Sequence, residues 1–178
     1  DTDEAIRLMQ ELTQKHPEND HFFFTLGHWY NESGDKDRCI ESMQRAIEIN
    51  GENAAALNYL GYTWAELGIR LDEAEELIRR ALSISPNDGF FIDSLGWVYF
   101  QRGEFERAAR ELERAHEIEM NDPTIAEHLG DAYERLGDLR RAADMYRRAL
   151  DHQEDPEQEA RLRGKLEKIE ATRPDLFR

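Results

Sequence analysis

TLGHWY (residues 25–30), YLGYTW (residues 59–64), SLGWVY (residues 94–99) and HLGDAY (residues 128–133) are four versions of one phrase, and they decide how this chain folds. Their glycines are separated by 34, 35 and 34 residues and lie at Gly27, Gly61, Gly96 and Gly130. A second glycine follows seven residues after each one, at Gly34, Gly68, Gly103 and Gly137. A fixed period of this length indicates an array of equal structural units.

Two more positions recur in every unit and explain its internal structure. They are a small residue (Cys39, Ala74, Ala108, Ala142) and, seven residues later, an alanine (Ala46, Ala81, Ala115, Ala149). Apolar spacing predicts two amphipathic helices of about 14 residues in each unit. The second glycine suits the left-handed residue that ends the first helix. The first glycine lies inside a helix, where it costs about 1 kcal/mol relative to alanine, so we expect it to permit close helix packing.

Composition agrees with an all-α protein and excludes several function classes. The chain has 178 residues with 23 basic and 39 acidic side chains, a net charge of −16, and a single valine, Val98. The scarcity of β-branched residues disfavours a sheet. The negative charge disfavours nucleic-acid binding, because it repels phosphates. No apolar run is long enough to insert into a membrane. The single cysteine, Cys39, excludes an internal disulfide and is expected to be a buried thiol.

This pattern resembles the tetratricopeptide repeat, whose series runs large apolar, Leu-Gly, Tyr, then Ala, large apolar, Ala, Pro. The resemblance implies an α-solenoid of antiparallel helix pairs in a single domain over residues 1–178. Its expected parts are the second helix of a truncated repeat (1–19), four full repeats (20–53, 54–88, 89–122 and 123–156), a capping helix (157–171) and a tail (172–178). The second repeat carries one extra residue in its turn, near residues 69–71.

The runs LNYLGYTWAELG (residues 57–68) and DSLGWVYFQRG (residues 93–103) resemble bacterial repeat proteins of the cell envelope, including scaffold lipoproteins. The chain begins inside a repeat, so we expect residue 1 to lie within a longer array. The apolar face of this first helix makes self-association through the open N-terminal end possible. The compartment stays undetermined: cytoplasmic, or periplasmic and outer-membrane-associated if a signal was removed. In the capping helix we expect ion pairs of Glu157 with Arg161 and of Glu159 with Arg163.

In the family that the chain resembles, the first helix of each repeat lines a concave groove. Carried over by position, the groove residues are Phe24, His28, Asn58, Tyr62, Phe90, Asp93, Trp97, Glu127 and Asp131. Aromatic residues are frequent interface hot spots. The three carboxylates are expected to lack basic neighbours on that face, which predicts a protein or peptide partner with apolar and basic residues. Alternatively, the rings pack between repeats and the carboxylates merely belong to an acidic surface.

The sequence predicts no catalytic residue, no metal and no cofactor. The six histidines include neither an HExxH motif nor a His-Cys cluster. The absence of Lys from the groove disfavours the clamp for a C-terminal carboxylate that some members of the family carry. We therefore expect a non-catalytic protein-interaction module. Two alternatives stay open: a scaffold that organises an assembly through its helix ends or convex face, and a hydrolytic enzyme using the groove carboxylates.

Overall fold

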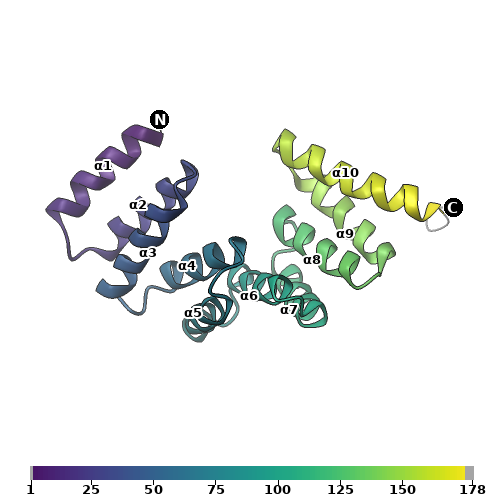
Figure 1. The fold of residues 1–178 in the computed structure, drawn as a ribbon, viewed down its shortest axis with the longest axis horizontal. Coiled ribbons are helices and arrows are strands. Elements are labelled where there is room, and N and C mark those ends of the chain that lie inside the picture. The colour runs from purple at the N-terminus through teal and green to yellow at the C-terminus, as the bar shows by residue number, and fades with distance from the viewer. Residues whose placement is uncertain (1, 175–178) are drawn as a thin grey trace. The chain divides into compact units, whose positions relative to one another are not determined.

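The computed structural model describes residues 2–174, and within this range it contains helices and no strand. Figure 1 labels them along the chain. They are α1 (Thr2–Lys15), α2 (Asp20–Glu32), α3 (Lys36–Ile49), α4 (Ala54–Glu66), α5 (Leu71–Ile84), α6 (Gly89–Gln101), α7 (Phe105–Ile118), α8 (Pro123–Arg135), α9 (Leu139–His152) and α10 (Pro156–Thr172). The predicted all-α solenoid of helix pairs is confirmed. Of the predicted tail, residues 175–178 lie outside the described range.

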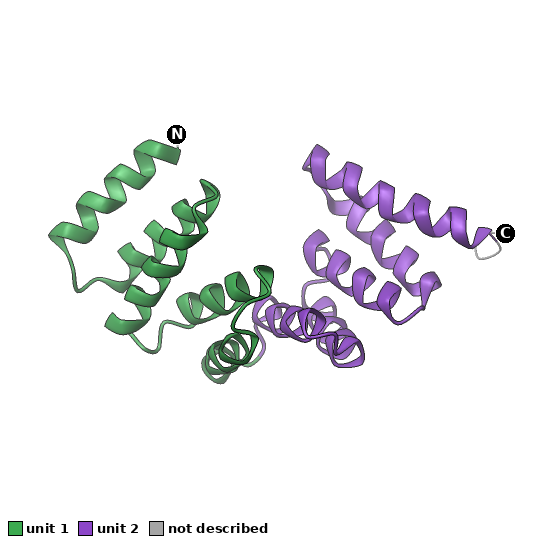
Figure 2. Ribbon diagram, in the orientation of Figure 1, with its two compact units in different colours: residues 1–86 green, residues 87–178 purple. Residues whose placement is uncertain are grey.

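The helices group into two compact units, residues 1–86 and residues 87–178 (Figure 2). The first unit contains α1 and the hairpins α2–α3 and α4–α5. The second contains the hairpins α6–α7 and α8–α9, followed by α10. The boundary between the units lies two residues before the predicted boundary between the second and third repeats, which is between residues 88 and 89.

Each hairpin turn contains a glycine, and in two of the four an aspartate caps the helix that follows. The four turn glycines have positive φ values between 66° and 82°, as the left-handed C-cap requires. In the hairpins α2–α3 and α8–α9, Asp35 and Asp138 then cap the second helix through hydrogen bonds from backbone N–H groups. Both carboxylates also bind an arginine three residues later, Arg38 and Arg141, at 2.6 Å.

The turn between α4 and α5 reverses this charge pattern. Here the extra residue places Arg70, rather than an acid, at the N-cap of α5, with φ of 48° and no side-chain cap. Its partner three residues later is Glu73, at 3.2 Å. The guanidinium of Arg70 lies 4.1 Å from the ring centroid of Trp64, a cation–π contact.

An arginine covers the equivalent aromatic ring in every hairpin. The distances from guanidinium carbon to ring centroid are 4.6 Å for Arg38 on Tyr30, 4.1 Å for Arg70 on Trp64, 3.9 Å for Arg107 on Tyr99 and 4.3 Å for Arg141 on Tyr133. The reversed ion pair of the second hairpin thus preserves this contact. The ring lies on the first helix and the arginine on the second, or at its N-cap in the case of Arg70, so the contact ties the two helices of one hairpin together.

The glycine inside the first helix of each hairpin allows close helix packing, as predicted. It makes room mainly for side chains of the second helix rather than for the backbone of that helix. A Cβ atom on Gly130 would lie 2.5 Å from Cε1 of Tyr146 on α9. On Gly61 it would lie 2.7 Å from Cγ1 of Ile78 on α5 and 2.9 Å from the carbonyl oxygen of Ala74. Cys39 is fully buried in its small-residue position, as expected, and burial raises the pKa of its thiol.

Candidate partner-binding surface

In the first unit, the structure brings Phe24 and His28 of α2 against Tyr59 of α4. Both rings meet Tyr59 edge to face, with centroid distances of 6.0 Å and 6.2 Å. All three side chains are half-buried, so each keeps a surface that a partner can reach. Burial raises the pKa of Tyr59, so its hydroxyl stays protonated at neutral pH and can donate a hydrogen bond.

The predicted groove residue Asn58 precedes Tyr59 and carries an unsatisfied polar atom. Its side-chain Oδ1 is buried and has no hydrogen-bond partner among the described residues. An orphaned buried acceptor costs free energy, about 1–3 kcal/mol, until a donor reaches it. Tyr62, one helical turn further along α4, is half-buried. These residues share α4 with Tyr59, and with Phe24 and His28 they are the predicted site residues of the first unit.

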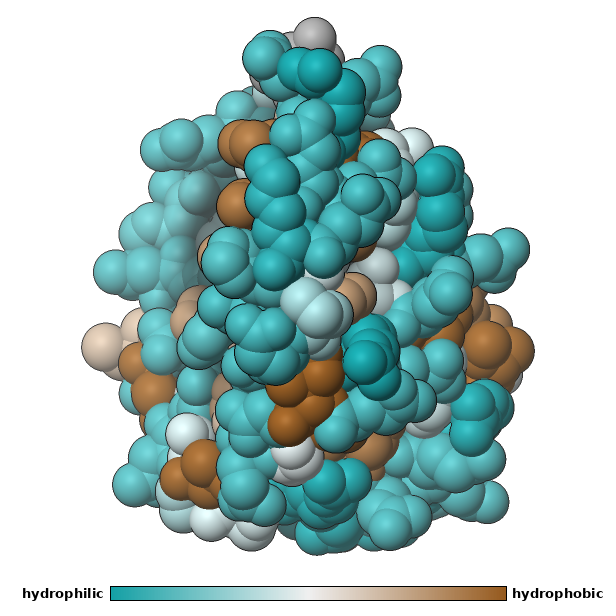
Figure 3. Space-filling model, turned by 90° about the vertical axis from the view of Figure 1, so that its left-hand side faces the viewer, coloured by the Kyte–Doolittle hydropathy of each residue, from teal (hydrophilic) through white to brown (hydrophobic). Residues whose placement is uncertain are grey.

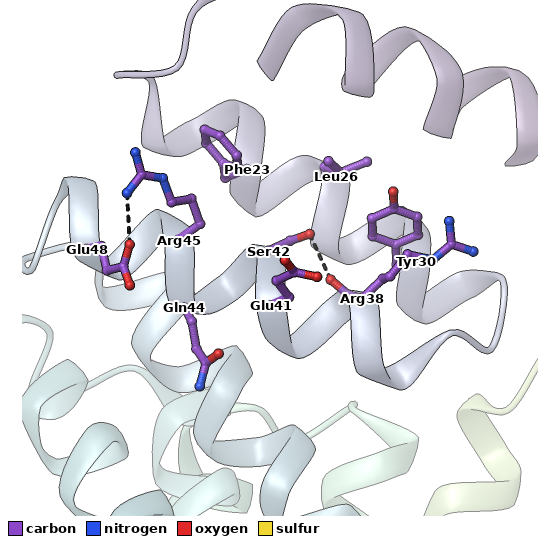
Figure 4. Close-up of a pocket in the computed structure, with 9 residues that line it drawn as sticks. All are labelled: Phe23, Leu26, Tyr30, Arg38, Glu41, Ser42, Gln44, Arg45 and Glu48. Carbon is purple, nitrogen blue, oxygen red and sulfur yellow. Dashed lines mark hydrogen bonds and ion pairs between the residues drawn. The ribbon is translucent and has the colours of Figure 1, made fainter. Parts of the chain in front are cut away.

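The other side of α2 lines a crevice that contains none of the predicted site residues. This crevice has a volume of about 470 Å³, and Phe23, Leu26 and Tyr30 of α2 form its apolar wall (Figure 4). A crevice of about the same volume lies one repeat later, where Leu60 and Trp64 take the places of Leu26 and Tyr30. Internal ion pairs partly fill the rims, as between Arg45 and Glu48 at 2.8 Å.

In the second unit, Trp97 belongs to a stack of rings. Its indole is nearly parallel to the imidazole of His128 at a centroid distance of 4.1 Å, and to the ring of Phe100 at 4.7 Å. Two rings stacked this closely cannot share one face of an indole without overlapping, so they cover opposite faces. Trp97 is therefore half-buried with both faces occupied, and only its edge is open to a partner.

His128 connects this stack to the predicted groove residue Asp93. Its Nδ1 lies 2.9 Å and 3.1 Å from the two carboxylate oxygens of Asp93, and both side chains are buried. Burial alone lowers the pKa of His128. The Asp93 charge and hydrogen bond outweigh that effect and raise the pKa above its ordinary value of 6.5. Asp93 thus has a basic partner that is cationic when protonated, which the expectation of carboxylates without basic neighbours missed.

The same expectation is wrong for Glu127 and Asp131, because α10 supplies their partners. Glu127 accepts hydrogen bonds from Arg161 at 2.5 Å and from Lys165 at 2.7 Å. Lys165 also binds Asp131 at 2.5 Å. One turn further along, Lys168 binds Glu134 at 2.9 Å. We call these contacts the α8–α10 ion ladder.

The ladder makes α10 part of the second unit rather than a purely solvating cap. Burial raises the pKa of Glu127, but Lys165 and Arg161 outweigh it and hold the pKa below its ordinary value, so the carboxylate is ionised. Leu162 and Ile169 of α10 are buried. The expected pair of Glu159 and Arg163 is present, at 2.6 Å. Arg161 instead reaches Glu127 across 34 residues, and not its sequence neighbour Glu157.

The remaining predicted groove residue, Phe90, lies apart from the stack. It is on the first turn of α6, two turns before Trp97, and is 52% exposed. Elsewhere the surface carries scattered apolar residues. Figure 3, which views the molecule from the left of Figure 1, shows separate brown patches among hydrophilic side chains.

Membrane-spanning helices and metal clusters are both missing from residues 2–174. No described helix combines the length and apolar character that crossing a bilayer requires. No group of three or more His, Cys, Asp or Glu side chains in that range is arranged to hold a metal ion.

Comparison with known proteins points to one family. Models of the tetratricopeptide repeat match residues 24–89 and 124–160, and a model of the TPR repeat matches residues 96–137. The chain is 32% identical over 110 residues to the TPR repeat-containing protein PA4667 of Pseudomonas aeruginosa, covering 62% of this chain and 19% of that protein. It is 24% identical over 105 residues to anaphase-promoting complex subunit 3 of Schizosaccharomyces pombe, covering 59% of this chain and 16% of that protein. The chain therefore spans less than a fifth of each of these relatives.

Solved structures share the architecture. A MamA crystal structure has a TM-score of 0.69 at 25% identity, covering 90% of this chain and 92% of that chain. TTC0263, a TPR protein of Thermus thermophilus, has a TM-score of 0.78 at 20% identity, covering 94% and 90%. A chain of the APC/C hetero-tetramer Cut9-Hcn1 has a TM-score of 0.85 at 18% identity, covering 97% of this chain and 34% of that chain. The narrower resemblance to cell-envelope lipoproteins is not confirmed by these comparisons. The repeat models, the relatives and the fold agree that this chain is a tetratricopeptide repeat protein.

Proposed function

We propose that the chain is a non-catalytic protein-interaction module whose main binding face in the first unit is formed by Phe24, His28, Asn58 and Tyr62. The observation that carries the proposal is the buried, unpaired Oδ1 of Asn58 beside the half-buried rings around Tyr59. Apolar rings with one unsatisfied acceptor suit a peptide segment that inserts apolar side chains and donates an N–H group to Asn58.

The ion ladder changes the expected chemistry of the partner. Because Glu127 and Asp131 already have cationic neighbours and Asp93 is paired with His128, these carboxylates give no strong reason for a basic partner in the second unit. A preference for basic segments then rests on the net charge of −16, which acts at long range and mainly on association rates. In the second unit, the accessible groove feature is the edge of Trp97.

Two variants that remove neighbouring phenylalanines of α2 test this face, one of them combined with a substitution on α4. Phe23 and Phe24 are neighbouring half-buried phenylalanines of α2, and Phe23 lines the crevice on the other side. We expect Phe24→Ala combined with Tyr62→Ala to lose proteins captured from a source lysate, and Phe23→Ala to retain them. Quantitative mass spectrometry measures the capture and circular dichroism checks helicity. Equal capture by both variants, with helicity intact, refutes the proposed face.

A scaffold that self-associates is the second candidate, and the surface of α1 favours it. Leu8 is 54% exposed, and Ile6, Met9 and Leu12 on the same helix are only half-buried. One structural neighbour also comes from a hetero-tetramer. Sedimentation velocity over a concentration series tests this role: association that Leu8→Glu abolishes supports it, and a monomer at all concentrations counts against it.

A further inference from the structure

We propose that the end of the α6–α7 hairpin is a second docking surface, for an amphipathic helix of a partner protein that carries apolar residues bordered by Lys or Arg. The surface consists of Phe90, Ile118 and Met120, which we call the edge patch. Their side chains are 52%, 44% and 63% exposed. The start of α6 lies beside the end of the antiparallel α7, since a Cβ on Gly89 would lie 3.3 Å from Cγ2 of Ile118; Phe90 follows Gly89 directly and Met120 is two residues after Ile118.

The edge patch is a departure of the third repeat from the other three. In the first, second and fourth repeats, the residues equivalent to Phe90 are His21, Ala55 and Thr124. Those equivalent to Ile118 are Ile49, Ile84 and His152. Those equivalent to Met120 are Gly51, Pro86 and Glu154. Only the third repeat has a large apolar residue at all three positions. The hairpin does not require this combination, since the other repeats form the same helix pair without it.

Carboxylates flank the residues of the edge patch along the chain and favour a cationic occupant. The side chain of Glu119 crosses the start of α6, where a Cβ on Gly89 would lie 2.5 Å from its Cγ. Asp88 caps α6 by accepting from the backbone N–H of Phe90 at 3.0 Å, and Asp122 likewise caps α8. Segments 87–91 and 117–123 contain four carboxylates and no Lys, Arg or His.

This combination selects the chemistry of the partner. Three exposed apolar side chains match the apolar face of a short helix, and the acidic border matches Lys or Arg beside that face. A second copy of this chain is a poor occupant, because each copy carries a net charge of −16 and repels another. The edge patch uses none of the residues Phe24, Asn58 or Tyr62, so it is independent of the proposed binding face in the first unit.

A synthetic 18-residue peptide of Leu and Lys, patterned as an amphipathic helix, is the probe. Two peptides of the same length act as controls, one of Leu and Glu and one of Ser and Lys. Binding is followed in protein labelled with ¹³C at the methionine methyl groups. Met120 reports on the edge patch, while the fully buried Met43 reports on the fold. We expect saturable shifts of the Met120 signal with the Leu–Lys peptide, a constant Met43 signal, and no saturable shift with either control peptide.

Two variants localise the binding. Because Phe90 is half-exposed, Phe90→Ala should leave the fold intact and weaken peptide binding at least tenfold, as loss of an aromatic anchor does. Leu67→Ala removes a side chain that is 44% exposed in the first unit and should change the affinity less than twofold. The double variant Phe24→Ala/Tyr62→Ala should also retain the Met120 shift, which separates this surface from the proposed binding face.

Several outcomes overturn the proposal. They are the absence of saturable binding up to millimolar peptide, binding without a Met120 shift, equal binding of the Ser–Lys peptide, and an unchanged affinity in Phe90→Ala. A Met120 shift that grows with protein concentration in the absence of peptide also overturns it, because a second copy would then occupy the surface.

Discussion

Replacing glycine by alanine should have opposite effects at two positions of the second unit. Gly130 lies inside α8 and Gly164 inside α10, so alanine favours the helix at both by about 1 kcal/mol. The surroundings differ. A Cβ on Gly130 would lie 2.5, 2.7 and 3.2 Å from three carbon atoms of the Tyr146 ring, whereas a Cβ on Gly164 meets no atom within 4 Å. We therefore expect Gly130→Ala to destabilise the second unit and Gly164→Ala to stabilise it.

The magnitudes follow from how little the Tyr146 ring can move. The ring is fully buried, and its hydroxyl oxygen lies 2.6 Å from a carboxylate oxygen of Asp131 and 2.9 Å from one of Glu134, so its single proton is shared between two acceptors. Overpacking a rigid core costs about 1–3 kcal/mol, and contacts this short belong at the upper end of that range. Once the gain in helix propensity is subtracted from the packing cost, Gly130→Ala should lower the free energy of unfolding by about 2 kcal/mol. Gly164→Ala should raise it by about 0.5–1 kcal/mol, because only the gain in helix propensity applies.

Native-state hydrogen exchange measures each effect in its own helix. Repeat arrays need not unfold all at once, so amides of α8 and of α10 are followed separately by NMR at increasing urea concentrations. Exchange from unit 1 amides, such as those of α4, serves as the internal control. The packing argument is refuted if Gly130→Ala is as stable as the natural chain. It also fails if Gly164→Ala loses stability, since no neighbouring atom opposes that Cβ.

Three further predictions concern charges in the second unit. Lys165→Met should lower the free energy of unfolding by about 2 kcal/mol, because it removes a cation from the buried Glu127. Urea unfolding measures this, and an unchanged midpoint of the urea transition contradicts the prediction. The pKa of His128 is raised in the folded state, so its pairing with Asp93 contributes fully to the free energy of unfolding below pH 6.5, and this contribution is lost as the pH rises through the folded-state pKa. Melting temperatures measured from pH 5 to 9 should show the loss, and the variant His128→Gln should not show this pH dependence. His116→Leu should raise the melting temperature, because both ring nitrogens are buried without partners where the other repeats carry isoleucine or leucine.

The fold followed from sequence because local signals and the period agreed. The turn glycines and the glycines at 27, 61, 96 and 130 mark each hairpin, and the structure places helices at the predicted positions. Ion pairing was harder to predict. The i, i+4 spacing favoured Glu157 as the partner of Arg161. Glu127 lies 34 residues before Arg161, one repeat earlier, so it is a second candidate. Arg161 pairs with Glu127 because that carboxylate is buried and needs a cation. Charge complementarity at a spacing of 34 residues was the available signal.

The binding surface was predicted less well, because position within a repeat does not reveal what covers a side chain. Trp97 lies on the expected helix, yet His128 and Phe100 cover its faces. No single repeat shows this, since His128 comes from the following hairpin. The arginine that covers each hairpin ring was also missed, although Arg38, Arg107 and Arg141 recur at one position. In the second hairpin, the inserted residue moves that arginine to Arg70 and hides the pattern.

The α8–α10 ion ladder also determines how short a working fragment of this protein can be. A fragment ending before α10 retains every hairpin, but it leaves the Glu127 side chain, which is 6% exposed, without Arg161 or Lys165. It also uncovers the surface of α9 beneath Leu162 and Ile169. We therefore expect a fragment that ends before α10 to be less stable at this end than one that retains the chain through Ile169.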